Sequence, residues 1–126
     1  MNTNSEKFSI DVIGDVTGNT WKGVFQAKIR LGKRDELRQD ELRRELLGAN
    51  PSGATPRAQN IAEVYSFCMA HIMDAPQWWK MNADGLDLED DNVAGAVYDN
   101  IVRLISEADQ KLKAQTEAAK AELSKE

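Results

Sequence analysis

The stretch 8–31 most constrains the fold, because its two halves have the alternation of a single β-hairpin. Gly18-Asn19 lies at its centre and suits a two-residue turn, which places Phe8 opposite Ile29. In this register the apolar face consists of Phe8, Ile10, Val12, Gly14, Val16, Trp21, Gly23, Phe25, Ala27 and Ile29. A shift of one residue would turn the lysines inward, so the pattern strongly favours these faces.

The hairpin needs a cover, because two strands alone are only marginally stable in water. Gly14 and Gly23 face each other in the expected register, which indicates either a bend or the close approach of another element. We expect the helices that follow in the chain to pack on the apolar face.

Three helices are predicted, at about 33–47, 56–74 and 90–112. Thr55-Pro56 has the residue types of a helix start, and Pro76 prevents the second helix from continuing. This second helix is the most apolar of the three, so we expect it to lie across the hairpin. Either Asp90 or Asp91 is expected to cap the third.

One α+β domain is therefore predicted over 8–112, which agrees with a length of 126 residues. We expect residues 1–7 to form a disordered lead-in. The polar tail 113–126 is predicted to be helical or disordered.

Charge and composition restrict the classes of partner. The net charge of -5 argues against a general nucleic-acid binder, and no apolar run is long enough to span a membrane. The single cysteine, Cys68, cannot form an internal disulfide and favours a reducing, cytosolic compartment.

No constellation of catalytic or metal-binding residues is evident. A calcium loop centred on Gly85 would need Lys80 at its first ligand position, where a carboxylate is required. Cys68 and His71 are two ligands at most, so we expect a buried thiol and a histidine at the surface or at the boundary of the core. The chain is predicted to have no catalytic residue, no metal ligands, no cofactor and no enzymatic activity.

Candidate binding residues are aromatic, sulfur-containing or basic. Trp78 and Trp79 follow Pro76, and they either seal the edge of the core or act as exposed anchors. The candidate apolar anchors are Trp78, Trp79, Trp21, Met69 and Met73. Arg43 and Arg44 belong either to a solvated helix face or to an electrostatic docking surface.

Charge is also unevenly distributed along the chain. Basic residues outnumber acidic ones over 22–44, whereas 74–92 is acidic. The two segments could neutralise each other within one molecule, or favour self-association or docking to a charged partner.

The order of four segments resembles a known family. FSIDVIGDVTGNTWKGVFQAKIRL, LRRELLG, PQWW and GLDLEDDNVAGAVYDNIV together resemble the small tail assembly chaperones of long-tailed, siphovirus-like bacteriophages and prophages, over roughly 8–107. The resemblance implies a non-enzymatic protein of the host cell cytoplasm that binds the tape-measure protein and recruits tail-tube subunits. Many members also have a longer, frameshifted form. The alternative is a structural head–tail or tail accessory subunit that is retained in the virion.

Overall fold

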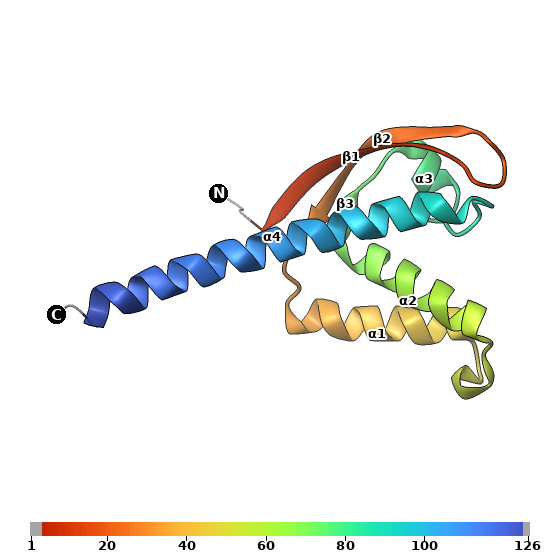
Figure 1. Ribbon diagram of the computed structural model, residues 1–126. Coiled ribbons are helices and arrows are strands. Elements are labelled where there is room, and N and C mark those ends of the chain that lie inside the picture. The colour runs from red at the N-terminus through yellow and green to blue at the C-terminus, as the bar shows by residue number, and fades with distance from the viewer. Residues whose placement is uncertain (1–3, 125–126) are drawn as a thin grey trace.

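A computed structural model of the chain describes residues 4–124 and shows an α+β fold with an N-terminal hairpin and a long C-terminal helix (Figure 1). The elements in chain order are β1 (Ser5–Ile13), β2 (Thr20–Lys28), α1 (Lys33–Leu47), the 3-10 turn η1 (Pro51–Gly53), α2 (Pro56–His71), β3 (Ile72–Asp74), α3 (Gln77–Met81) and α4 (Asp91–Ser124). The three strands form one antiparallel sheet in the order β1-β2-β3.

The hairpin register differs from the expected one by four residues. Phe8 pairs with Phe25 instead of Ile29, and the connection spans 14–19 instead of two residues. It is closed by backbone bonds from Gly14 N–H to the Asn19 carbonyl (2.8 Å) and from Gly18 N–H to the Gly14 carbonyl (3.0 Å). An even shift keeps each side chain on its face, so the alternation could not distinguish the two registers.

The expected faces are therefore largely confirmed despite the different register. The buried strand residues include Phe8, Ile10, Phe25 and Ala27. Val16 is the exception, because it lies in the longer turn and is 63% exposed. The close approach of other elements at the two inward glycines is confirmed, although they do not face each other: a Cβ on Gly14 would lie 2.1 Å from Asp90 Oδ2, and one on Gly23 would lie 2.3 Å from Pro76 Cγ.

The expected disordered lead-in is wrong for residues 5–7, which begin β1. Asn4 is also fixed: its side chain accepts from Arg30 N–H (2.8 Å) and donates to the Arg30 carbonyl (2.9 Å). Residues 1–3 lie outside the described part of the chain. The strand extends further because its backbone pairs with the end of β2, which polar side chains do not prevent.

The helix at 33–47 is confirmed, but the other two differ from expectation. α2 ends at His71 instead of 74, because Ile72 and Asp74 pair with the free edge of β2 at Ala27 and Gln26. Backbone bonds to a neighbouring strand thus replace a last helical turn. α4 begins at Asp91 and continues to Ser124 instead of ending near 112. Of the two predictions for the polar tail, the helical one is therefore confirmed for residues 113–124.

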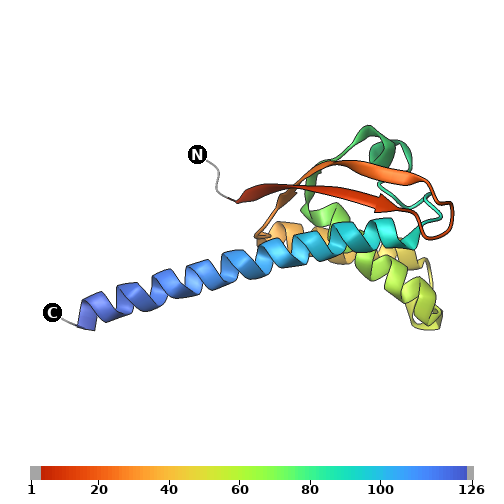
Figure 2. The ribbon, with the colours of Figure 1, turned by 45° about the horizontal axis from the view of Figure 1, so that its top comes forward.

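The three longer helices lie on one side of the sheet, in the succession α4, α2 and α1 (Figures 1 and 2). α4 runs along β1, and α2 packs against both α4 and α1, so α4 takes the place beside the hairpin that we expected for the second helix. The core residues are Phe8, Ile10, Phe25, Ala27, Tyr65, Cys68, Ala75, Trp79, Val93, Ala94, Val97 and Ile101. No helix among residues 4–124 is both long and apolar enough to cross a membrane.

Candidate interaction surface

The structure brings the three tryptophans together at one end of the sheet. Trp78 lies 5.1 Å from Trp21 and 6.2 Å from Trp79, measured between ring centroids. β2 supplies Trp21, whereas the short helix α3 supplies the other two. Because neighbouring residues of a helix point in different directions, Trp78 and Trp79 have different surroundings.

Trp79 belongs to the core. It is 1% exposed, and its ring meets Phe25 edge-on at 5.4 Å and stacks on Tyr65 at 6.5 Å. Gly85 completes the enclosure, since a Cβ there would lie 2.6 Å from Trp79 Cη2. The interpretation that the tryptophans seal the core is therefore correct for Trp79, and this side chain is not accessible as an anchor.

Trp78 and Trp21 are half-buried at the edge of the core. The indole N–H of Trp78 donates to the Lys22 carbonyl (3.0 Å), and that of Trp21 donates to Asp90 Oδ2 (2.8 Å). Each indole therefore has its polar atom satisfied within the fold while part of its ring remains accessible. Such rings are rigid apolar contact surface, because little rotamer entropy remains to be lost on binding.

The methionines add exposed apolar surface near α3. Met81 is 74% exposed and follows Trp78 by three positions, which places both on one side of α3. We call Trp21, Trp78 and Met81 the tryptophan rim. Met73 on β3 is 53% exposed, and its neighbour Asp74 forms an ion pair with Lys80 of α3 (2.7 Å). Met69 is half-buried on α2.

A buried carboxylate, Asp90, holds the hairpin turn against the start of α4. Its Oδ1 accepts from the backbone N–H groups of Val16 (2.7 Å) and Thr17 (2.8 Å), and its Oδ2 accepts from the Thr17 hydroxyl (2.6 Å) and the Trp21 indole. Asn92 adds two hydrogen bonds: its side-chain amide donates to the Ile13 carbonyl, and its Oδ1 accepts from the Asp15 N–H. The side chain of Asp90 thus serves the hairpin, and we did not anticipate this from the sequence.

The ionisation of Asp90 follows from these contacts. Burial raises the pKa of a carboxyl group, but the four hydrogen bonds stabilise the charged form more strongly and lower the pKa of Asp90 to about 2. Asp90 is 0% exposed, so it is a buried negative charge that neutral hydrogen-bond donors stabilise, one of them the Trp21 indole of the tryptophan rim. The unexplained inward glycine at position 14 was the sequence signal for this close approach.

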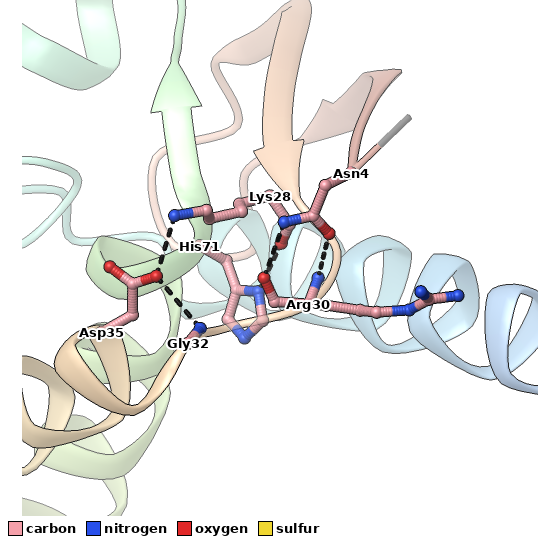
Figure 3. Close-up of polar contacts among 6 residues, drawn as sticks. All are labelled: Asn4, Lys28, Arg30, Gly32, Asp35 and His71. Atoms are coloured by element: carbon pink, nitrogen blue, oxygen red, sulfur yellow. Dashed lines mark hydrogen bonds and ion pairs between the residues drawn. The ribbon is translucent and has the colours of Figure 1, made fainter. Parts of the chain in front are cut away.

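His71 and Lys28 lie at a second polar cluster, where β2 leads into α1 (Figure 3). His71 is buried, with 4% of its surface exposed, so the expected position at the surface or boundary is wrong; its Nδ1 lies 2.6 Å from the Lys28 carbonyl. Burial lowers the pKa of His71. Lys28 Nζ bonds Asp35 Oδ2 (2.8 Å), which also accepts from Gly32 N–H (3.2 Å). These contacts fix the start of α1 to the sheet.

Cys68 is buried at 0% exposure, as expected. Burial raises the pKa of its thiol to about 12, so it is protonated at neutral pH. Within residues 4–124 no group of three or more His, Cys, Asp or Glu side chains is arranged to hold a metal ion.

The two candidate arginines are not near the tryptophans. Arg43 and Arg44 lie on α1 and both pair with Asp40, at 2.9 and 3.2 Å. Open depressions of about 240 and 510 Å³ adjoin Arg43 and Arg44 respectively, with largely charged linings. Figure 1 shows α3 at the top of the molecule and α1 at the bottom, so the basic and aromatic candidates form separate surfaces.

The basic and acidic segments do not neutralise each other through direct pairing. Asp74 pairs with Lys80 inside the acidic segment, and Asp91 pairs with Arg57 of α2 (2.8 Å). Over the described 4–124, no ion pair joins segment 22–44 to segment 74–92.

Comparison of the chain with protein-family models, with curated proteins and with solved structures found no match.

Proposed function

We propose that this protein is a non-enzymatic tail assembly chaperone of the long-tailed phage type. In this role it binds the tape-measure protein in the host cell cytoplasm and helps to recruit tail-tube subunits. The observation that supports the proposal best is the tryptophan rim, which presents accessible apolar surface on a rigid base.

The chemistry of the rim suits a helical partner. A tape-measure protein is long and helical, and a protein that holds it needs apolar anchors surrounded by polar groups. Trp78 and Met81 supply the anchors, and the Lys80–Asp74 ion pair supplies an adjacent polar margin. Methionine adapts its shape to different neighbours, which favours binding to many similar helical segments along one partner.

Co-expression with the neighbouring large helical tail protein tests the proposal. We expect that protein to be recovered in the soluble fraction only when this chain is present, and to be lost with the double variant Trp78→Ala/Met81→Ala. The matched control is Arg43→Ala/Arg44→Ala, which changes two side chains on the opposite surface and should retain recovery. Far-UV circular dichroism of each variant checks that its fold is unchanged.

Unchanged recovery without this chain would contradict the proposal. Recovery that depends on the arginines but not on the tryptophan rim would move the binding surface to α1. The protein content of purified phage particles separates the chaperone from the alternative, a structural head–tail or tail accessory subunit. A chaperone is absent from the finished particle, whereas a structural subunit is present.

A further inference from the structure

The last part of α4 extends beyond the domain as a free helical arm, defined as residues 109–124 (Figures 1 and 2). Every residue of the arm is exposed. A single helix without tertiary packing gains little stability from its own propensity, since most helical stability in proteins comes from packing of an apolar face. The arm therefore has a face available for packing with another chain.

The two leucines of the arm, Leu112 and Leu123, fall on one side of the helix, whereas Ala114 and Ala121 lie on the opposite side. With a spacing of three or four residues, the leucines belong to a stripe that begins before the arm and consists of Ile105, Ala108, Leu112, Thr116, Ala119 and Leu123. Leu112 is 44% exposed and Leu123 is 72% exposed. The same spacing leads back to Val97 and Ile101, which are fully buried. The stripe thus continues the side of α4 that faces the domain.

We propose that the arm pairs with the arm of a second copy of this chain, with the two helices antiparallel and the apolar stripes in contact. A parallel pair is excluded by the position of the stripe. It lies on the side of α4 that carries the domain, so two parallel copies would place both domains in the same space. Antiparallel arms place the domains at opposite ends of the pair.

Side-chain size favours one antiparallel register, in which the two-fold axis passes between Gln115 and Thr116. Leu112 then lies opposite Ala119 of the second copy, and Ala108 lies opposite Leu123. Each layer combines a large side chain with a small one, which fills the space between two helices without voids.

Charge favours the same arrangement. Residues 109–115 carry one acid and two lysines, whereas 116–124 carry two acids and one lysine. In an antiparallel pair the positive first half of each arm therefore lies beside the negative second half of the other, and the two attract. On one flank of the stripe Asp109 approaches Lys120 of the second copy, and on the other flank Lys111 approaches Glu122. Symmetry makes each of these pairs occur twice. This contact shares no residue with the tryptophan rim, so its test does not depend on whether the proposed function is correct.

Complementary charge reversal tests the pairing in the full-length chain, with sedimentation equilibrium as the readout. We expect Asp109→Lys or Lys120→Asp alone to raise the dimer dissociation constant about tenfold, because two attractive pairs become repulsive. An equimolar mixture of the two variants should dimerise as wild type does, since both pairs are restored in the mixed dimer. Gln110→Lys on the opposite side of the helix is the control and should have no effect.

Disulfide trapping tests the register. Thr116→Cys lies next to the two-fold axis, so mild oxidation should join two copies through a disulfide, whereas Gln110→Cys should form no cross-link between copies. The native Cys68 is buried and does not interfere. A monomer across the micromolar range would overturn the proposal, as would a dimer that is insensitive to both charge reversals. A monomeric chain whose arm instead captures the large helical tail protein would also overturn it.

Discussion

Replacing Trp79 by Ala should destabilise the domain severely, because this ring is the largest fully buried side chain. A buried Trp→Ala substitution costs about 3–5 kcal/mol, including the loss of aromatic contacts such as those with Phe25 and Tyr65. A domain of this size has a total free energy of unfolding of about 5–15 kcal/mol. The variant therefore loses a large share of its stability.

Urea denaturation followed by far-UV circular dichroism measures this loss. With a slope of about 1.5 kcal/mol per molar urea, the midpoint should fall by about 2–3 M while the slope stays unchanged. Trp78→Ala is the matched control: it removes a half-buried indole and the hydrogen bond to Lys22, and should cost about 1–2 kcal/mol. Equal losses, or a larger loss in Trp78→Ala, would refute the division of roles between the two tryptophans.

Three further predictions concern stability. Gly85→Ala should lower the free energy of unfolding by about 1–3 kcal/mol in urea, because φ is +87° and the new methyl group would collide with Trp79. Asp90→Ala should lower the urea midpoint more than Asp91→Ala. Because the pKa of Asp90 falls from 3.8 to about 2 on folding, the contribution of its charge to the free energy of unfolding should be complete above pH 4 and be lost as the pH falls through 2. Burial lowers the pKa of His71, so thermal melts should show stability decreasing as the pH falls below 6.5, and His71→Gln should abolish this dependence, whereas an unchanged slope would contradict the assignment.

Sequence patterns were sufficient to predict a structural feature where that feature depends on neighbouring residues only. The charged helix at 33–47 has both predicted ends, because Gly32 and Gly48 interrupt the helical residues there. The faces of the hairpin were predictable from alternation. Its register was not, because a shift of four residues preserves the alternation and the difference lies in contacts with a distant residue, Asp90.

The candidate site was only partly predictable for the same reason. Adjacent tryptophans in the sequence gave no basis for assigning one to the core and one to the surface. That distinction depends on Tyr65 and Phe25, which are supplied by other elements. Met81 was missed because only the position of α3 at the edge of the core leaves it exposed.

Alternation and helix-start residues were enough to predict which side chains face inward, where most helices begin, and that an apolar hairpin must be covered. The hairpin register, the change from α2 to β3 and the accessibility of each indole depend instead on contacts between distant elements. Periodicity and capping act over only a few neighbouring residues. By contrast, the bonds from Val16, Thr17 and Trp21 to Asp90 join residues about seventy positions apart, and they exist only once the chain has folded.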